Sequence, residues 1–346
     1  MSSVPHGSES ALGLIGVING MWMSQVVCVA AELGIADLLT DGSKPIQELA
    51  QATDSHPPSL HRLMRALVVL GLCRELDDGA FALTSIGMSL RANAPDSLHA
   101  WALWSRRYIW PLWGKLLDTV RTGQNARKLV QGTEDFGHLE SDTAAAEAFN
   151  LAMVALSRHV GKELARAYDF TEIRLIIDVG GGYGGLLATI LAACPQARGA
   201  VYDLPHLMVG ARMHLANANI ATRCEFISGS FFETIPSGAD AYILKNIIHD
   251  WDDERSAEIL RNCRRVIGPD AKLLIVERIM PTRLESTESH RVLARADLAM
   301  LVGLHGRERT EAEYRALLDS AGFNLTQVLP MALEFNIIEA VPRKTA

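Results

Sequence analysis

A glycine-rich segment in the second half of the chain, Asp178–Gly184, constrains the fold more than any other feature. It follows the apolar run Leu175–Ile177, which is typical of a buried strand, and it precedes Leu186–Leu191, which is typical of a helix. Glycine lets the backbone turn sharply and lets a ligand approach closely, and a helix N-terminus presents unpaired N–H groups. This order of strand, turn and helix predicts an anion- or nucleotide-binding element.

The glycine spacing alone is a weak signal, although Gly180, Gly182 and Gly185 match the pattern G-x-G-x-x-G. The next predicted strand, residues 199–203, ends in Asp203, where a carboxylate can accept hydrogen bonds from a ribose. Both signals together predict a nucleotide-type ligand rather than an incidental tight turn. An NAD(P)-dependent dehydrogenase shares this pattern and is therefore an alternative function at this point.

Length and charge narrow the class of protein. The chain has 346 residues, about two domains' worth, and a net charge of −7. Because phosphates require a basic face, this charge argues against a nucleic-acid partner. The five cysteines are scattered and form no C-x-x-C pair, so we expect neither a disulfide framework nor a zinc site, and a cytoplasmic location.

An uncharged segment at residues 11–31 is long enough to span a bilayer. It contains Asn19, Ser24 and Gln25, and no Lys or Arg precedes it as in a signal peptide. A helix that is apolar on all sides can also be buried against protein. We therefore favour a helix in a subunit interface over a membrane span.

The first hundred residues have a winged-helix pattern. Helices are predicted at Ile46–Ala52 and Ser59–Leu70, and two short apolar runs then flank Asp77–Gly79, which is a hairpin signal. Winged helices often bind DNA, so a transcription regulator is an alternative. Residues 1–100 contain five Lys or Arg and ten Asp or Glu. The net charge of this segment is therefore negative, which is unfavourable for binding a phosphate backbone.

Residues 99–160 are predicted to be helical and are unusually aromatic. Five rings fall within thirteen positions: Trp101, Trp104, Tyr108, Trp110 and Trp113. They form either a packed helix pair or one wall of a pocket for a flat, apolar ligand. Phe149 and Met153, on a following helix, could face the same space.

From about residue 169 strands and helices alternate. Strands are predicted at 174–179, 199–203, 223–228, 240–244, 271–277 and 334–341, and the main helices at 184–194, 206–218, 253–266 and 310–322. Such alternation predicts an α/β fold with a mostly parallel, doubly wound sheet that binds its ligand at the carboxyl ends of the strands. The predicted domains are residues 1–100, 101–168 and 169–346.

A histidine and two carboxylates are predicted at this same rim. His249 follows one strand, Glu277 ends the next, and Glu308 precedes a helix whose start has the capping-box pair Thr310 and Glu313. Carboxylates beside an imidazole would orient the ring and raise its proton affinity, as a general base requires. Alternatively, His249 is a buried structural histidine and Asp250 caps the helix that begins near residue 252.

Five segments in a fixed order carry a family resemblance: Asp178–Gly184, Tyr202–His206, Gly229–Phe232, Leu244–Trp251 and Gly306–Thr310. Over nearly its whole length the chain resembles the S-adenosylmethionine-dependent O-methyltransferases of the plant caffeate/flavonoid and bacterial antibiotic-tailoring type. The resemblance implies a Rossmann-like class I methyltransferase domain. It also implies a mainly α-helical, winged-helix-like N-terminal domain that forms a homodimer and binds no DNA.

The resemblance implies S-adenosylmethionine as the methyl donor, S-adenosylhomocysteine as the product, and no metal. The implied cofactor-binding residues are Asp178, Gly180, Gly182, Asp203, Leu204, Ser230, Phe231 and Lys245. Ser230 departs from the family, which usually has Gly-Asp where this chain has Gly229-Ser230. This substitution affects one expected contact, that with the adenine amino group.

The resemblance also implies the reaction, which is methylation of a hydroxyl on a small aromatic or polyketide-like natural product. His249 would be the general base, positioned by Glu277 and Glu308. A neutral histidine with a pKa near ~6.5 would help to ionise a phenol whose reference pKa is about 10. The expected acceptor-contacting residues are Trp104, Tyr108, Phe149, Met153, Asp250 and Met300.

Some members of this family retain the cofactor but carry out other chemistry on natural products. A rearrangement, hydroxylation or decarboxylation is therefore the alternative function. The intact His249 and both glutamates favour methyl transfer. We expect neither nucleic acid nor membrane among the partners.

Overall fold

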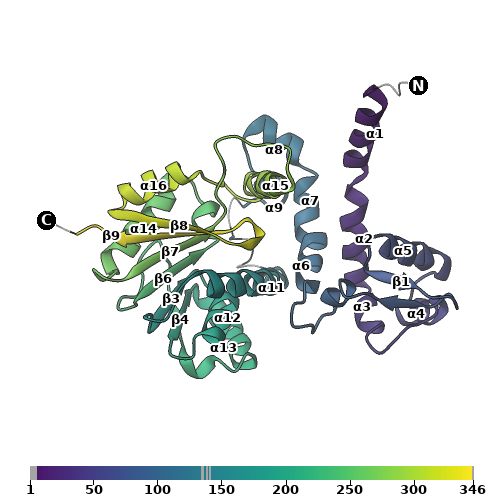
Figure 1. Cartoon of the computed structure of the whole chain (residues 1–346), viewed down its shortest axis with the longest axis horizontal. Coiled ribbons are helices and arrows are strands. Elements are labelled where there is room, and N and C mark those ends of the chain that lie inside the picture. The colour runs from purple at the N-terminus through teal and green to yellow at the C-terminus, as the bar shows by residue number, and fades with distance from the viewer. Residues whose placement is uncertain (1–5, 134–135, 138, 140–141, 345–346) are drawn as a thin grey trace. The chain divides into compact units, whose positions relative to one another are not determined.

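The computed structural model describes residues 6–133, 136–137, 139 and 142–344 (Figure 1). The chain divides into two compact units, residues 1–110 and 111–346. Each unit has its own core, and each is described by itself.

The first unit is helical with one small hairpin. Its helices are α1 (His6–Asn19), α2 (Met21–Glu32), α3 (Ile35–Leu38), α4 (Ile46–Ala52), α5 (Pro57–Val69) and α6 (His99–Trp104), with shorter helical turns at Gly87–Leu90 and Ser105–Ile109. Strands β1 (Cys73–Glu75) and β2 (Phe81–Leu83) pair antiparallel. Gly71 ends the turn after α5 at φ +74°, which favours glycine. The helices predicted around residues 46–52 and 59–70 and the hairpin after them are confirmed.

The uncharged segment forms most of α1 and α2. Residues 11–32 are long and apolar enough to cross a membrane, with a mean hydropathy of 1.7, and 17% of that stretch is buried within the chain. Leu12, Val17 and Ile18 are more than half exposed. Helices α1 and α2 thus leave an apolar face that their own chain does not cover.

The second unit is built on a seven-stranded sheet in the order β5-β4-β3-β6-β7-β9-β8. The strands are β3 (Leu175–Val179), β4 (Arg198–Asp203), β5 (Cys224–Ser228), β6 (Ala241–Lys245), β7 (Lys272–Glu277), β8 (Phe323–Pro330) and β9 (Asn336–Pro342). Strands β3 to β7 are parallel, whereas β9 runs antiparallel to β7 and β8. The mostly parallel sheet is confirmed.

Strand β8 was not predicted. It lies at the edge of the sheet and its exposed and buried residues do not alternate regularly, so its sequence lacks the apolar run of a central strand.

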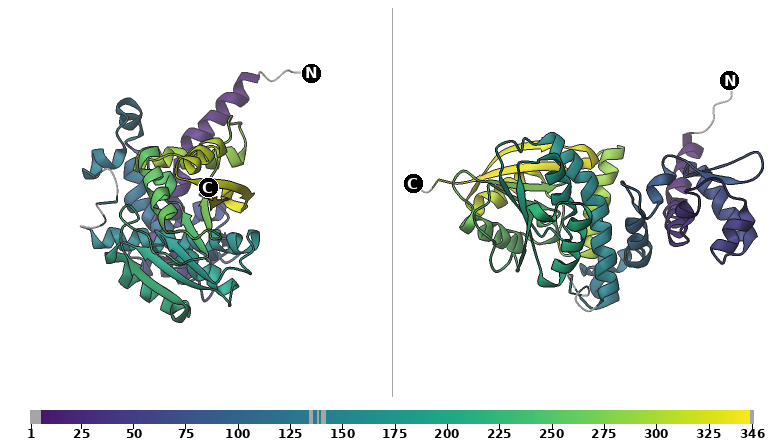
Figure 2. Two further views of the ribbon diagram at one scale, coloured as in Figure 1. Left: turned by 90° about the vertical axis from the view of Figure 1, so that its left-hand side faces the viewer. Right: turned by 90° about the horizontal axis from the view of Figure 1, so that it is seen from below.

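Helices cover both faces of this sheet (Figure 1 and Figure 2). One face packs against α14 (Asp253–Val266) and α16 (Glu311–Ser320). The other packs against α11 (Thr143–Ala167), α12 (Gly185–Ala193) and α13 (Met208–Asn217). The other α-helices among the described residues are α7 (Trp110–Trp113), α8 (Leu116–Thr122), α9 (Ala126–Gln131) and α15 (Glu288–Gly303).

The strand order reverses at β3. Strands β4 and β5 extend to one side of it, and β6 and β7 extend to the other. In open α/β sheets the crevice outside the carboxyl ends of the strands at such a reversal is the usual ligand site. The loops after β3, β4, β6 and β7 are therefore expected to carry the functional residues.

Candidate active site

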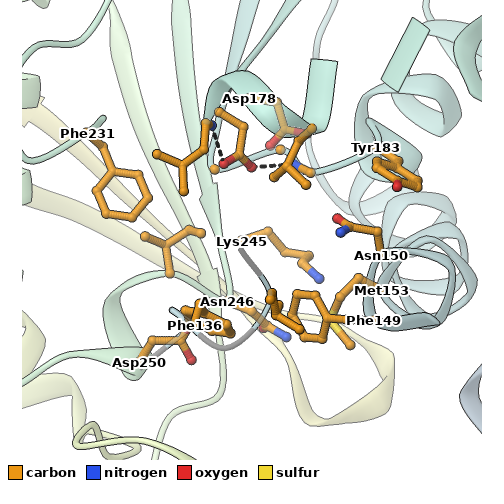
Figure 3. Close-up of a pocket in the computed structure, with 18 of the residues that line it drawn as sticks. Phe136, Phe149, Asn150, Met153, Asp178, Tyr183, Phe231, Lys245, Asn246 and Asp250 are labelled. Atoms are coloured by element: carbon orange, nitrogen blue, oxygen red, sulfur yellow. Dashed lines mark hydrogen bonds between the residues drawn. The ribbon is translucent and has the colours of Figure 1, made fainter. Parts of the chain in front are cut away.

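A cavity of about 350 Å³ opens at this reversal point (Figure 3). Its walls come from the glycine loop after β3, the end of β4, residues 229–232, residues 245–251 after β6, and α11. The lining includes all eight predicted cofactor-binding residues: Asp178, Gly180, Gly182, Asp203, Leu204, Ser230, Phe231 and Lys245. Their individual roles stay predictions.

The glycine loop adopts a backbone conformation that requires glycine. Gly180, Gly182 and Gly184 have φ angles of +73°, +55° and +77°. A Cβ atom on Gly180 would lie 2.4 Å from Cδ1 of Ile247, and α12 begins directly after Gly184. The loop therefore brings bare backbone and a helix N-terminus to the cavity.

Asp203 braces this loop from the end of β4. Its Oδ2 accepts a hydrogen bond from the Gly182 N–H at 2.7 Å, and its Oδ1 accepts one from the Leu204 N–H at 2.7 Å. Burial raises the pKa of Asp203, and these two N–H groups work to lower it. The carboxylate thus holds the loop and also faces the cavity.

Two groups of opposite charge lie near the carboxyl ends of β3 and β6: Asp178, which is buried, and Lys245, which is half-buried. Burial raises the pKa of Asp178 to about 7, against the opposing charge of Lys245. Burial lowers the pKa of Lys245 to about 8, and its Nζ donates to Ser157 Oγ at 3.0 Å. Within the described residues Oδ2 of Asp178 has no hydrogen-bond partner.

The segment after β5 supplies an aromatic edge to the cavity. The Phe231 ring meets those of Phe232 and Trp251 edge to face, with centroids 4.8 and 6.3 Å apart. Ser230 Oγ accepts a hydrogen bond from the Phe232 N–H at 3.3 Å. Its short, neutral side chain stands where the family usually has a carboxylate.

His249 lies in a turn after β6 and is 4% exposed. Its Nδ1 is 3.1 Å from Oε1 of Glu308, and its Nε2 is 3.3 Å from Oδ1 of Asp250. Asp250 lines the cavity, together with Asn246, Ile247 and Trp251 (Figure 3). The imidazole therefore lies between two carboxylates, one of which faces the ligand space.

The carboxylates around the imidazole raise the pKa of His249 above the reference value of about 6.5. Burial works to lower the pKa of His249, but the charges of Glu308 and Asp250 outweigh it and raise the pKa to about 9. Burial in turn raises the pKa of Asp250 to about 7, against the opposing charge of His249. The direction of this shift is the one that the neighbouring carboxylates predict.

Glu277 acts on His249 through the main chain. Its Oε1 accepts hydrogen bonds from the N–H groups of Ile247, Ile248 and His249 at 3.0, 2.7 and 3.2 Å. Its Oε2 accepts one from the Tyr314 hydroxyl. In the described part of the chain none of its hydrogen bonds reaches the imidazole. The interpretation that both glutamates orient the ring is corrected, since only Glu308 contacts it.

The loop before α16 delivers Glu308. This residue is 4% exposed, and its N–H donates to Oδ1 of Asp297 at 3.0 Å. The capping box predicted for Thr310 and Glu313 is confirmed. Asp250 does not cap α14, because the cap is Asp252, whose side chain accepts from the Arg255 N–H.

The residues predicted to contact the acceptor separate into three groups. Phe149, Met153 and Asp250 line the cavity (Figure 3). Met300 lies on α15 and is not among the described residues that line it. Trp104 and Tyr108 belong to the first unit, where their rings stack with centroids 4.4 Å apart.

Several lining residues were not predicted, among them Phe136, Asn150, Tyr183 and Asn246. Asn150 is next to Phe149 on α11, and Asn246 lies within the segment that carried the resemblance. Sequence reasoning could therefore have pointed to these two positions, whereas the direction of each side chain depends on packing. In the described ranges no group of three His, Cys, Asp or Glu side chains is arranged to hold a metal ion.

Comparison with known families matches almost all of this chain. The family model described as an O-methyltransferase domain matches residues 113–324, and the one described as an O-methyltransferase dimerisation domain matches residues 15–91. The chain belongs to the O-methyltransferase family. The predicted family, fold class and enzyme class are confirmed.

Similar proteins come from bacterial natural-product pathways. The phenazine O-methyltransferase PhzM of Lysobacter antibioticus is 40% identical over 329 residues, which cover 95% of both chains. The crystal structure of LaPhzM matches with a TM-score of 0.90 and 40% identity, covering 98% of this chain and all of that one.

Two further relatives bear on ligands and chemistry. One is the structure of an O-methyltransferase from neocarzinostatin biosynthesis in complex with S-adenosylmethionine and 2-hydroxy-5-methyl naphthoic acid. It matches with a TM-score of 0.74 and 30% identity over 92% of this chain and 95% of that one. The other is the aclacinomycin 10-hydroxylase RdmB of Streptomyces purpurascens, 33% identical over 321 residues, which cover 90% of this chain and 85% of its own.

Proposed function

We propose that this enzyme transfers the methyl group of S-adenosylmethionine to a hydroxyl of a small aromatic or polyketide-like natural product, releasing S-adenosylhomocysteine. The observation that carries the proposal is one cavity that joins the glycine loop to the turn of His249 and Asp250. The donor site thus shares this space with Asp250, whose carboxylate contacts Nε2 of His249. The relatives named for phenazine and naphthoic acid support an aromatic acceptor.

The chain's own residues fit the donor. Gly180 and Gly182 would lie against its methionine end, Asp203 would accept from the ribose hydroxyls, and Phe231 would contact the adenine. Asp178 and Lys245 would lie near its charged groups, and Leu204 and Ser230 beside the adenine. When bound, this donor supplies a methyl group already activated by a positive sulfur. The relative with S-adenosylmethionine in its structure supports this assignment.

His249 would take the proton of the acceptor hydroxyl at Nε2, once the carboxylate of Asp250, now 3.3 Å from that nitrogen, yields this position to the acceptor, while Nδ1 stays bonded to Glu308. A raised pKa of about 9 brings the imidazole close to the reference pKa of a phenol, about 10, so the proton transfer is nearly balanced. Phe149 and Met153 would hold the acceptor ring so that its oxygen points at the methyl group. Alignment of this kind is a large part of catalysis.

We also propose that the enzyme is a cytoplasmic homodimer, with the exposed apolar face of α1 and α2 covered by a second copy. The match of residues 15–91 to a dimerisation domain supports this. Residues 101–168 would then contribute to the acceptor pocket, as the domain prediction has it. Light scattering after gel filtration should give twice the chain mass, and a monomer would contradict the proposal.

The transfer itself is tested with isotope-labelled S-adenosylmethionine and a panel of phenolic, naphthoic and phenazine acceptors. We expect label in the product and a mass gain of one CH₂ unit. Binding of S-adenosylmethionine without transfer to any acceptor would count against methylation. Binding of a nicotinamide nucleotide instead would favour the dehydrogenase.

The second candidate function is non-methylating chemistry on a similar substrate with the same cofactor retained. The similarity of this chain to a protein named as a hydroxylase supports this second candidate. Product mass separates the two functions, because hydroxylation adds one oxygen and decarboxylation removes carbon dioxide, and neither adds CH₂.

A further inference from the structure

We propose that Arg309 is a positioning residue that holds the turn of the base against the loop of its carboxylate partner. The turn is residues 246–251, called the His249 turn, and the loop is residues 306–309, called the Glu308 loop. The inference rests on the proposed function, in which His249 is the base, and adds a residue that acts through it.

Arg309 is fully buried and donates to the main chain of the His249 turn. Its Nη1 donates to the carbonyl oxygen of Ile248 at 2.9 Å, and its Nη2 donates to that of Trp251 at 2.8 Å. Its Nε and Nη2 also donate to Oδ1 of Asp253 at 2.9 and 2.8 Å. The guanidinium thus spans both sides of His249 along the chain, and its charge is balanced by one carboxylate.

Arg309 and Glu277 hold the same turn by opposite groups. Glu277 accepts from the N–H groups of residues 247–249, whereas Arg309 donates to carbonyl groups at 248 and 251. A short turn of this kind leaves such main-chain groups unpaired, and each would be costly to bury without a partner. A buried cation and a buried anion together satisfy the turn from both sides.

The Glu308 loop lies directly against the His249 turn. A Cβ atom on Gly306 would be 1.8 Å from the carbonyl oxygen of His249, so no larger residue fits there without movement. Behind the loop, the Met280 N–H donates to the Arg309 carbonyl at 2.9 Å, and Ile279 forms a parallel bridge with Arg309. The Glu308 loop therefore lies between the residues that follow β7 and the His249 turn.

Arg309 follows Glu308 in sequence, so the position of one constrains the other. Three carboxylates act on the imidazole: Glu308 at Nδ1, Asp250 at Nε2, and Glu277 at longer range. The nearby cations include Lys245 and Arg309, and also Arg278 and Arg295, which both interact electrostatically with Glu308. Without the hydrogen bonds of Arg309, the contact between Glu308 and His249 should loosen. The pKa of His249 should then fall, because Glu308 is the carboxylate that raises it most.

The test compares Arg309→Gln and Arg309→Lys with Arg315→Gln, an arginine on α16 whose side chain is 49% exposed and pairs with Glu311. For Arg309→Gln we expect kcat at pH 9 to fall about 10- to 100-fold, the size expected for a small misplacement of a reacting group. The pH at which the rate levels off should shift downward, and the Kd for S-adenosylmethionine should stay within about twofold. Arg309→Lys should recover part of kcat, and Arg315→Gln should resemble the wild type.

A double-mutant cycle with Glu308→Gln makes the test specific. Both single variants should shift the pH profile in the same direction, and the double variant should lose less than the sum of the two. An unshifted pH profile for Arg309→Gln, or additive losses, would overturn the inference and leave Arg309 a purely structural residue.

Gly306→Ala keeps the test decisive if Arg309→Gln does not fold, as judged by near-ultraviolet circular dichroism. The added methyl should push the Glu308 loop from the His249 turn and shift the profile downward while Arg309 remains. An unshifted profile would overturn the inference. Failure of the proposed function is separate, because it would appear as full activity in His249→Ala.

Discussion

The two halves of the cavity are built in different ways. On the donor side, Gly180, Gly182 and Asp203 come from consecutive loops within 25 residues of chain, and the main working groups are backbone N–H groups and one carboxylate. On the base side, His249, Glu277 and Glu308 come from three separate segments, and buried charged side chains hold one another in place.

The difference is one of local against distant interactions. A left-handed glycine turn between a strand and a helix is set by neighbouring residues, so it is recognisable in sequence and tolerant of what surrounds it. A buried histidine between carboxylates depends on every partner, because an unpaired charge in a protein interior is costly. Variants on the two sides should therefore affect different steps.

The largest effect is expected on the base side. His249→Ala should lower kcat by roughly 10²- to 10⁴-fold, the usual contribution of a general base. The Kd for S-adenosylmethionine should change little, because the donor side does not depend on the ring. Steady-state kinetics and calorimetry measure the two, with the exposed His56→Ala as control. A comparable loss of donor binding would break the distinction between the halves.

The pH profile probes the same side without a mutation. A base must be unprotonated, and the pKa of His249 is raised to about 9, so kcat/KM should rise about tenfold per pH unit from 7 and level off near 9. Glu308→Gln removes a charge that favours the imidazolium, so its profile should level off at lower pH. A wild-type profile already flat at pH 7 would contradict the raised pKa.

On the donor side, Asp203→Asn leaves the N–H of Gly182 or of Leu204 without its carboxylate acceptor. Hydrogen bonds to a charged group contribute about 1.5–3 kcal/mol, so the Kd for S-adenosylmethionine should rise about 10- to 100-fold. At saturating donor, kcat should fall much less. Calorimetric titration checks this, and the exposed Asp270→Asn should bind normally.

The smallest effect is expected at Ser230, where the chain departs from its family. Ser230→Asp should tighten S-adenosylmethionine binding by a few-fold, since a carboxylate accepts more strongly than a hydroxyl from the adenine amino group. An analogue with inosine in place of adenosine lacks that amino group and should show no gain. An equal gain in affinity for S-adenosylmethionine and for the inosine analogue would show that the new carboxylate does not act on the adenine amino group.

Particular residues show how far sequence reasoning reached. The central strands β3, β6 and β7 are continuous apolar runs and were predicted within a few residues, whereas the edge strand β8 was not. The cavity-lining role of Phe149 and Met153 followed from their place on a helix. Asn150 and Tyr183 did not, because only the packing of α11 against the glycine loop turns them inward.

What the sequence by itself determined is the local chemistry: a glycine turn at a strand end, an acid after the next strand, and a histidine followed by an aspartate at the same rim. These depend on spacing and on the alternation of strands and helices, which neighbouring residues encode. Only the tertiary structure decided that Glu308 contacts the imidazole, that Glu277 and Arg309 hold its main chain, and that the histidine pKa is raised. The physical reason is that burial and charge pairing act between segments far apart in the chain, and their balance exists only once those segments are packed together.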